Sequence, residues 1–489
     1  MDILKIHPAD NVAVVLHGMK KGTEARGIRL EEDVPAGHKV ALSPIAAGEA
    51  IIKYGAPIGT ARQDIRPGEW VHTHNLKTGL SGVLEYRYDP VPLSEARKPP
   101  RTFQGFRRKS GKAGIRNEIW ILPTVGCVNS VAQKLAEKAA AFCTGSVSGV
   151  YAFPHPYGCS QLGEDHLNTQ KALAGLVRHP NAGGVLVLGL GCENNNIAAF
   201  RTILGEVDPE RVKFLNCQDA EDEMTAGLAM LRELCGAAAG DRRVDIPASE
   251  LVIGLKCGGS DGFSGITANP AVGAFSDRLT AEGGTVLLTE VPEMFGAETR
   301  LMERCADRET FEQTVELING FKEYFLRYGQ TVYENPSPGN KEGGITTLED
   351  KSLGCTQKSG ASAVRGVLRY GDAVERKGLN LLQAPGNDLV ASTALAVSGA
   401  QAVLFTTGRG TPFGCPVPTI KISSNSALAQ KKKGWIDFDA GRILETGDPA
   451  GCGEELYQYL LKVASGELQT RNEEHGMRDI AIFKDGVTL

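Results

Sequence analysis

From residue 118 onward, short apolar runs end one after another in turns of small, polar or cysteine residues. Four to seven apolar residues without alternation are typical of strands buried on both faces, as in a parallel sheet covered by helices. In open parallel sheets the ligand lies at the carboxyl ends of the strands. The pattern therefore predicts an α/β protein with its site in these turns. The clearest runs are 118–125, 185–190, 251–255 and 402–405.

Residues 1–90 follow a different pattern. Short alternating strands, such as 12–16 and 40–42, are interrupted by Gly or Pro every eight to twelve residues. One turn recurs, in which a hydrophobic residue and two spacers precede a glycine, and a polar residue follows it. Such a turn needs the φ freedom of glycine. This region is predicted to be a small all-β module, and its three turn glycines are Gly37, Gly48 and Gly68.

The rest of the chain is predicted to form two α/β domains after a joint. A proline-rich and charged linker is expected at 91–103. The second domain, 104–243, contains an amphipathic helix after its first strand and is a candidate dimerisation domain. The third domain, 244–489, contains a helix that opens at Asn269-Pro270 and ends at Gly283-Gly284, with Pro at its start and Gly past its end. We expect a mostly parallel sheet there.

Composition narrows the class of protein. The 489 residues suggest about three domains of ~150 residues each. A net charge of −5 gives no electrostatic reason to expect nucleic acid or an anionic membrane as a partner. No apolar stretch approaches the roughly 18 residues that span a bilayer, and the first residues lack the core of a signal peptide. The eleven cysteines are an odd count, which favours reduced thiols or metal ligands over a disulfide framework. We expect a cytoplasmic protein.

Two histidines form the first candidate for chemistry. His72 and His74 follow the third glycine turn and precede Asn75. On a strand, residues i and i+2 share one face, so both imidazoles would project together. Paired imidazoles suit a divalent metal or acid–base chemistry. The alternative is an edge strand with two histidines that have no special role.

Cysteines at the predicted strand ends form the second candidate, namely Cys127, Cys159, Cys192, Cys257 and Cys355. No pair has the CxxC spacing of a zinc or ferredoxin site. Free cysteine is commonly a small buried hydrophobe, which is the alternative interpretation. Their common place at strand ends predicts that several thiols converge at one sheet edge and bind iron. The expected metal ligands are Cys127, Cys159, Cys192 and Cys257.

A glycine-rich segment at 256–265 resembles an anion cradle in front of the helix that opens at Asn269. Backbone N–H groups at a helix N-terminus bind carboxylate or phosphate readily. The segment is neither a Walker A motif nor a GxGxxG motif, so a small carboxylate fits better than a nucleotide. Ser260 and Asp261 are its polar side chains. The alternative is a tight turn without a ligand.

Cations and amides in further glycine-rich turns extend this candidate site. Alone, each would be a solvated charge or a structural ion pair, but together they suit a polyhydroxylated anion, with Arg or Lys on its carboxylate. Some lie in the segment 333–360, which has little periodicity and is too long for a bare connection. The residues concerned are Arg116, Asn117, Lys341, Lys351 and Arg409.

These motifs closely resemble the altronate/galactarate dehydratase family along nearly the whole chain. The resemblance implies a β-clip (SAF) N-terminal domain, a middle domain, and a Rossmann-like C-terminal domain without nucleotide. It also implies activation by Fe²⁺ under reducing conditions; Mn²⁺ and an oxygen-sensitive iron–sulfur cluster remain open as alternatives. The matching stretches are 72–75, 116–117, 123–129, 157–163, 189–194, 257–270, 334–341, 343–351 and 407–412.

The reaction implied by the resemblance is the loss of water from D-altronate to give 2-dehydro-3-deoxy-D-gluconate. The C2 proton is weakly acidic, so iron chelated by the carboxylate and 2-hydroxyl would stabilise the enediolate-like dianion. We expect His74, with His72 or His155, to transfer protons. Substrate would be held by Asn75, Arg116, Asn117, Ser260, Asp261, Lys341 and Arg409.

Other functions stay open at this point. Galactarate is the alternative substrate, although the turn around Cys355 looks less like that branch. The βα pattern alone would also suit an NAD-dependent oxidoreductase, which the missing GxGxxG motif argues against. A non-catalytic sugar-acid binding protein is the third alternative, disfavoured by the density of polar residues at strand ends. We expect a homodimer.

Overall fold

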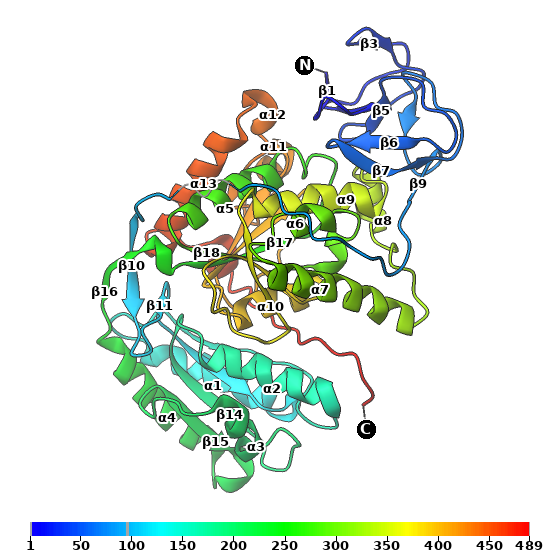
Figure 1. Cartoon of the computed structure of the whole chain (residues 1–489). Helices are drawn as coiled ribbons and strands as arrows, with labels where there is room; N and C mark the ends of the chain where they lie inside the picture. Colours follow the sequence, from blue (N-terminus) through cyan, green and yellow to red (C-terminus); the bar gives the residue numbers. More distant parts are fainter. Residues whose placement is uncertain (1, 94–96, 489) are drawn as a thin grey trace.

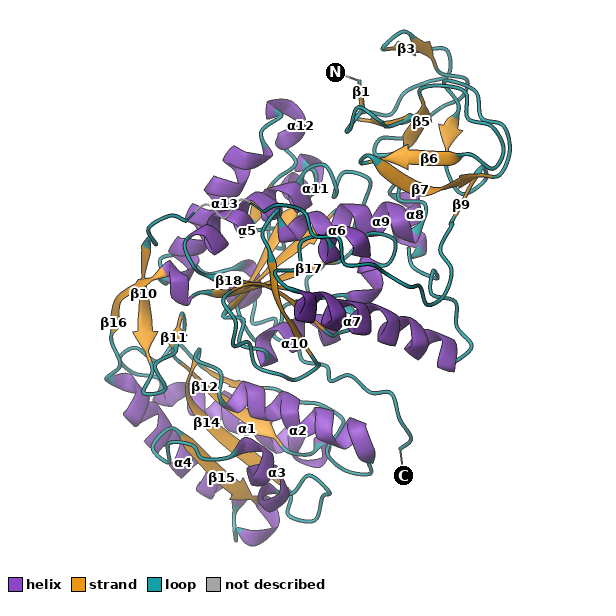
Figure 2. Ribbon diagram, viewed as in Figure 1, coloured by secondary structure: helices purple, strands orange, loops and turns teal. Residues whose placement is uncertain are grey.

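Three units follow one another along the computed structural model, which describes residues 2–93 and 97–488 (Figures 1 and 2). A small β unit lies at one end of the molecule, a large α/β unit at the centre, and a second α/β unit at the other end (Figure 1). This arrangement confirms the predicted multidomain class, an all-β module followed by α/β units. None of the described helices is long and apolar enough to cross a membrane.

The N-terminal unit contains two small antiparallel sheets and a hairpin. Its three recurring turn glycines have φ of +82°, +85° and +87°, the left-handed region in which side chains are disfavoured. The predicted glycine turns are therefore confirmed. One sheet has the order β1 (Ile3–Leu4), β2 (Val12–Val15), β5 (Lys39–Ala41), β8 (Trp70–Val71); the other has β6 (Ala50–Lys53), β7 (Ala56–Ala61), β9 (Leu76–Lys77); the hairpin is β3 (Glu24–Ala25) and β4 (Ile28–Arg29).

The middle unit is a four-stranded parallel sheet with helices on both faces. Alternate residues of its first strand point to opposite faces. Ile119 and Ile121 pack with α1 and α4, whereas Trp120 and Leu122 pack with α2 and α3. The strand order is β13 (Val150–Ala152), β12 (Glu118–Pro123), β14 (Ala182–Gly189), β15 (Val212–Asn216), and the helices are α1 (Asn129–Ala139), α2 (Gly163–Val177), α3 (Ile197–Leu204) and α4 (Glu223–Ala239).

The C-terminal unit is a seven-stranded sheet in which every pairing is parallel, as predicted. Its order is β19 (Val364–Leu368), β20 (Gly378–Leu382), β18 (Thr285–Leu288), β17 (Val252–Cys257), β21 (Ala402–Thr407), β22 (Thr419–Ser423), β23 (Phe438–Asp439). The longer helices are α5 (Ala268–Ala281), α7 (Arg308–Arg327), α10 (Asp388–Val397) and α13 (Pro449–Ala464); the short ones are α6 (Glu298–Met302), α8 (Pro338–Glu342), α9 (Leu348–Cys355), α11 (Ser426–Lys431), α12 (Ile443–Thr446) and α14 (Arg471–Glu474).

The two α/β units are joined by paired strands and by a shared core. β10 (Thr102–Arg107) pairs antiparallel with β16 (Arg243–Pro247) and with β11 (Ala113–Gly114). The proposed domain limits at 103/104 and 243/244 fall inside this pair, and residues 94–96 of the proposed linker lie outside the described residues. Helix α2 packs on α10 so closely that a Cβ on Gly175 would lie 2.6 Å from the Val397 carbonyl oxygen.

Both parallel sheets contain a point at which the strand order reverses. In the large sheet, β18 and β21 lie on opposite sides of β17; in the middle sheet, β13 and β14 flank β12. Loops that leave the carboxyl ends of such strands diverge and form the crevice in which open α/β sheets bind ligands. The fold therefore offers two crevices, and the loops after 257 and 407 belong to one of them.

Candidate active site between the N-terminal module and the large sheet

Loops after β17 and β21 meet at the reversal point of the large sheet. The amides of Gly408 and Arg409 both donate to the Gly259 carbonyl at 3.0 Å. The buried Asp261 carboxylate accepts from the Ser264 amide at 3.0 Å, the Ser424 hydroxyl at 2.8 Å and Asn425 Nδ2 at 3.1 Å. Burial raises the pKa of Asp261 despite these bonds. Asp261 therefore joins the glycine-rich cradle to the loop after β22.

Ser260 differs from its neighbour. Its side chain is buried, yet its Oγ has no hydrogen-bond partner among the described residues. An unpaired buried hydroxyl costs free energy unless a ligand or water completes it. Ser260 also lines a narrow pocket of about 10 Å³, to which Lys53 and Tyr54 of the N-terminal unit contribute. The pocket is lined by Lys53, Tyr54, Ser260, Asp261, Asp350 and Cys355, among others.

The N-terminal module contributes two lysines that share one carboxylate. Lys39 Nζ lies 2.8 Å from one oxygen of Asp350, and Lys53 Nζ lies 2.9 Å from the other. All three side chains are buried, and Lys39 also donates to the Gly344 carbonyl at 2.7 Å. Asp350 belongs to α9, so this triad joins the small β unit to the large sheet. One negative charge thus faces two positive ones.

The charge imbalance shifts the protonation equilibria. Burial, with the neighbouring charge of Lys53, lowers the pKa of Lys39 to about 8 in spite of Asp350. Burial would also lower the pKa of Lys53, but the charge of Asp350 outweighs it and raises that pKa. For Asp350, burial is outweighed by both lysines, which hold its pKa well below the usual range. Burial raises the pKa of the adjacent Tyr54 to about 12, so its phenol stays protonated.

Two thiols and a carboxylate converge behind the same pocket. Cys257 Sγ lies 3.4 Å from Cys355 Sγ and 3.0 Å from Glu293 Oε2, and Cys355 Sγ lies 3.2 Å from the same oxygen. Among the described residues, this is the one place where three or more His, Cys, Asp or Glu ligand atoms lie within 4.8 Å of one another. The hydrogen bond to Cys257, together with burial, raises the pKa of the Cys355 thiol.

Buried lysines surround these thiols. Lys351 Nζ lies 2.8 Å from Glu293 Oε1, Lys358 Nζ lies 3.2 Å from Glu290, and Lys256 is ion-paired with Glu290. Burial would raise the pKa of Glu293, but Lys351 and its neighbours lower it strongly. The Glu293 carboxylate is therefore ionised, and it lies between the two thiols and these positive charges.

The donor set fits a divalent transition metal. Four ligands at ~2.3 Å around a tetrahedral ion lie about 3.8 Å apart, so the observed 3.0–3.4 Å spacings need only a small opening. Thiolate ligands favour Fe²⁺ or Zn²⁺, whereas Mn²⁺ prefers oxygen donors. Two sulfurs and one oxygen thus suit iron better than manganese.

The two predicted strand histidines lie elsewhere than expected. β8 ends at Val71, so His72 and His74 lie in a turn and do not share a strand face; that prediction is wrong. The turn forms because Asn75 Oδ1 accepts from the His72 amide at 2.9 Å and its Nδ2 donates to the Trp70 carbonyl at 2.9 Å. The Asn75 side chain is buried inside the turn, where it makes these two hydrogen bonds. His74 is exposed, and its ring contacts Trp70.

His72 instead contributes to docking of the module. Its Nε2 donates to the Lys341 carbonyl at 2.9 Å, and its Nδ1 accepts from the Thr73 amide at 2.7 Å. His38 stacks on it with ring centroids 5.1 Å apart and donates to the Glu342 carbonyl at 3.1 Å. Burial lowers both pKa values, that of His38 to about 4. Two neutral imidazoles therefore bind the last carbonyls of α8.

Two predicted substrate ligands and one predicted proton-transfer residue are engaged in bonds away from the pocket. Arg116 is buried against Glu473, with Nε–Oε1 at 2.6 Å, and Asn117 Nδ2 donates to the Ala238 carbonyl at 2.9 Å. His155 Nε2 donates to the Pro123 carbonyl at 2.8 Å, and its Nδ1 accepts from the Tyr157 amide at 3.2 Å. The structure does not bring these three residues to the pocket.

Lys341 and Arg409 lie closer to the pocket. Lys341 is half-buried on α8, next to the cradle. Arg409 is exposed and pairs with Glu342 at 3.0 Å while donating to the Gly339 carbonyl at 3.1 Å. Both therefore lie on segments next to the cradle, as does the buried Asn340, which donates to the Ser260 carbonyl at 2.8 Å.

The four cysteines predicted to bind metal are divided between two sheets. Cys257 ends β17 in the large sheet, whereas Cys127, Cys159 and Cys192 follow strands of the middle sheet. Each does follow a buried strand, but sequence does not show which strands pair. The structure therefore brings Cys257 to Cys355 and Glu293 rather than to the other three.

Sequence reasoning missed the residues that carry most of the buried charge. Glu290 and Glu293 follow β18, a strand end of the kind already examined, so the same rule would have found them. Lys39 and Lys53 lie within apolar β-strands, where a lysine is unusual unless paired. Asp350 gave no local signal, because its partners lie 297 and 311 residues away.

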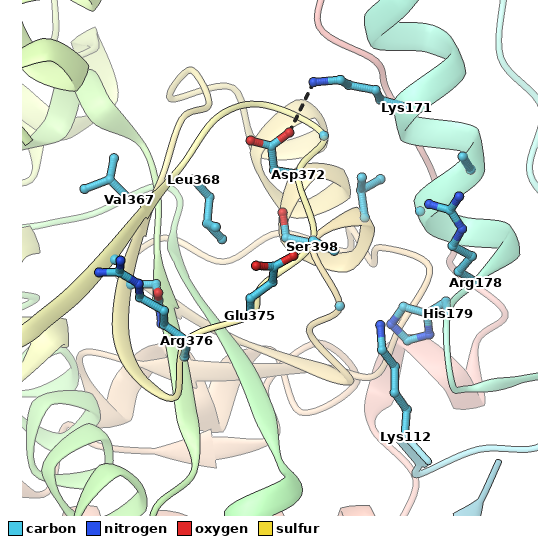
Figure 3. Close-up of a pocket in the computed structure, with 18 of the residues that line it drawn as sticks. Lys112, Lys171, Arg178, His179, Val367, Leu368, Asp372, Glu375, Arg376 and Ser398 are labelled. Atoms are coloured by element: carbon cyan, nitrogen blue, oxygen red, sulfur yellow. Dashed lines mark hydrogen bonds and ion pairs between the residues drawn. The ribbon is translucent and has the colours of Figure 1, made fainter. Parts of the chain in front are cut away.

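A larger cavity lies away from this site. It measures about 510 Å³ and separates α2 of the middle unit from the large sheet (Figure 3). Lys112, Arg178 and His179 line one side, and Glu375 and Arg376 the other; at its edge Lys171 pairs with Asp372 at 3.1 Å (Figure 3). None of the predicted site residues lines it.

Comparison with known families assigns each of the three units. Residues 1–79 match the altronate/galactarate dehydratase SAF domain. Residues 105–239 match the second domain of D-galactarate dehydratase/altronate hydrolase, and residues 248–488 match the C-terminal D-galactarate/altronate dehydratase domain. The three matches follow the same order as the units of the fold.

Individual proteins match over almost the whole length. The chain is 55% identical to "Altronate dehydratase" of Bacillus subtilis (strain 168), with 99% of each chain covered. It is 54% identical to "Altronate dehydratase" of Escherichia coli (strain K12), with 100% of each covered. Identity falls to 35% with "Galactarate dehydratase (L-threo-forming)" of Escherichia coli (strain K12), which covers 98% of this chain and 96% of that protein.

Proposed function

Since this chain belongs to the altronate/galactarate dehydratase family, we propose that it is a hydro-lyase that converts D-altronate to 2-dehydro-3-deoxy-D-gluconate and water. Identity of 54–55% with two altronate dehydratases, against 35% with a galactarate dehydratase, supports altronate as the substrate. Galactarate is the second candidate on the strength of that more distant relative.

The observation that carries this function is the buried excess of positive charge at the pocket. Lys39 and Lys53 share only Asp350, so one buried ammonium lacks a counter-charge. A buried charge without a partner is costly, and a substrate carboxylate would supply the missing negative charge. The same cations would stabilise the dianion that forms when the C2 proton leaves, because preorganised charges act strongly in a water-poor site.

We assign proton transfer to the lysine pair and to Tyr54; Lys53 and Tyr54 line the pocket, and Lys39 shares the Asp350 carboxylate with Lys53. With a pKa near 8, the lysine pair releases one proton easily, and a neutral amine can then accept the C2 proton. Tyr54 keeps its phenolic proton and lines the pocket, so it can protonate the departing C3 hydroxyl. The free Ser260 hydroxyl would hold another substrate hydroxyl. This assignment favours Lys39 and Lys53 over the predicted His74, which is exposed.

We infer that Cys257, Cys355 and Glu293 would hold the activating Fe²⁺. When bound, a divalent metal supplies Lewis-acid stabilisation of negative oxygens. Cys355 lines the pocket, which supports a metal held next to the substrate. Lys351 pairs with Glu293 and also donates to Asn335 and Asn340, at 3.0 and 3.2 Å, so it orients the carboxylate rather than binding substrate.

The function is tested by assaying the full chain anaerobically with Fe²⁺ and a thiol reductant. We expect a 2-keto-3-deoxy acid from D-altronate, with D-galactarate much poorer, and loss of activity on chelation. Turnover of galactarate without turnover of altronate would contradict the substrate assignment. Full activity in the presence of a strong chelator and air would contradict the metal assignment.

A further inference from the structure

Three cysteines of the middle unit are exposed at one edge of its sheet. Cys127 follows β12, Cys192 follows β14, and Cys159 lies in the loop after β13. Of the eleven cysteines, these three are exposed, and the others are buried or half-buried. Free cysteine is among the most often buried residue types, so three exposed thiols at one edge call for an explanation.

The three loops that carry these thiols are bonded to one another. The Gly126 amide donates to the Tyr157 carbonyl at 2.9 Å, which joins the first loop to the second. The Asn195 amide donates to the Gly158 carbonyl at 2.9 Å, which joins the second to the third. The Ser160 amide donates to Asn194 Oδ1 at 3.0 Å. Residues adjacent to Cys159 thus contact both other loops.

The loops approach each other too closely for larger residues. Gly158 has φ of +101°, and a Cβ there would lie 1.9 Å from the Thr124 carbonyl oxygen. Asn195 Nδ2 donates to the same carbonyl at 3.1 Å. Asn195 is fully buried, and its Oδ1 has no partner among the described residues. The arrangement holds the three loops in fixed relation and leaves one buried polar atom of the third loop without a partner among the described residues.

These thiols lie at the strand-order reversal of the middle sheet. β13 and β14 flank β12, so the loops with Cys159, Cys127 and Cys192 diverge around one point. That is the position at which open α/β sheets bind their ligands. The chemistry of three thiols at such a point is metal binding, because thiolates are soft ligands.

We propose that Cys127, Cys159 and Cys192 bind an iron–sulfur cluster, separate from the Cys257–Glu293–Cys355 group. A single tetrahedral ion would need sulfurs about 3.8 Å apart at ~2.3 Å metal–sulfur distances. Among the described residues, only Cys257, Glu293 and Cys355 have three ligand atoms within 4.8 Å of one another, so the sulfurs of Cys127, Cys159 and Cys192 lie farther apart than that. A cluster spreads its ligands over several irons and accommodates wider spacing.

The test uses the full chain, purified anaerobically and without any sugar acid. Iron and acid-labile sulfide are counted per chain, and the visible and electron paramagnetic resonance spectra are recorded after reduction. We expect sulfide and a cluster signal in the parent protein, and loss of most of both in Cys127→Ser, Cys159→Ser and Cys192→Ser. Circular dichroism checks that each variant is folded.

Matched variants make the result specific. Cys217 follows β15 at the same edge but packs into the apolar core, and Cys143 follows α1. Cys217→Ser and Cys143→Ser should keep sulfide and spectrum, and Cys355→Ser should lose iron without losing sulfide. Iron without sulfide in the parent protein, or sulfide retained in all three key variants, would overturn the proposal. Loss of sulfide in Cys217→Ser would overturn the three-thiol assignment.

Because no substrate is used, this outcome does not depend on the proposed function. A protein that turns over altronate but contains no sulfide would refute the cluster alone. A protein that contains a cluster but does not act on altronate would refute only the assignment of altronate as the substrate.

Discussion

The two strand-order reversals of this molecule have the same topology but carry different side chains. At the large sheet, the loops after β17 and β21 are buried beneath the N-terminal module and surrounded by lysines and carboxylates. At the middle sheet, the loops carry exposed thiols. The same backbone arrangement therefore serves an anion in one place and, in our proposal, a metal cluster in the other. Topology places the site, and the side chains select the ligand.

The largest effect should come from the lysine pair. We expect Lys39→Met to lower kcat by about 10²–10⁴, the range for loss of a general acid or base, because the pair then loses its readily released proton. Lys53 and Asp350 would remain as a neutral ion pair, so the fold should persist. Steady-state kinetics and a thermal melt separate the two effects. His74→Ala is the comparison: a drop of similar size there would return the proton transfer to His74.

The pH dependence of kcat tests the assignment of proton transfer to Lys39. The pKa of Lys39 is lowered to about 8, so its amine is protonated below that pH and neutral above it. Activity should therefore rise with pH through about 8 and fall as the solution is acidified. Measured kcat against pH should lose this rise in Lys39→Met. A rise that persists unchanged would show that another group controls it.

Removal of the shared carboxylate should mainly affect stability. Asp350→Asn leaves two buried ammonium groups without a partner, and breaking a buried pair costs about 3–5 kcal/mol. The low pKa of Asp350 means that its contribution is present above pH ~4 and is lost as pH falls through the folded-state value. Chemical denaturation measures the change. A decrease in the free energy of unfolding of less than about 1 kcal/mol would mean that water reaches the three charged groups.

His155→Asn tests the middle unit with a smaller expected effect. His155 bonds two backbone groups that position the loops of Cys127 and Cys159, and each lost buried bond costs about 1–3 kcal/mol. We expect lower stability and lower sulfide content but an unchanged KM for altronate. A large rise in KM would place substrate at this crevice instead.

Arg409→Met should have the smallest effect on stability. Its pair with Glu342 is exposed, and such pairs contribute about 0–1 kcal/mol. Because the Arg409 amide bonds the cradle while its side chain is exposed, we expect any kinetic change to appear in KM rather than kcat. Equal loss of kcat would give it a role in the chemical step.

Local sequence patterns predicted the elements well. The run at 118–125 forms β12, and its residues alternate between two apolar faces, as an uninterrupted apolar run requires. The Asn269-Pro270 and Gly283-Gly284 signals located α5 to within two residues at each end, although the helix begins at Ala268 and Pro270 is its third residue rather than its first. The prediction failed at His72 and His74, because the side chain of Asn75 forms a turn there and ends the strand after two residues.

The sequence by itself determined the strands, the helix limits, the glycine turns and the placement of polar residues at strand ends, because these depend on neighbours within a few positions. Only the tertiary structure decided which strand ends meet. It separated Cys127 from Cys257, and it joined Lys39 and Lys53 to Asp350 across about three hundred residues. Strand order and domain docking arise from contacts between distant segments, and no local periodicity records them. The charge that makes the pocket selective for an anion exists only once those segments are packed together.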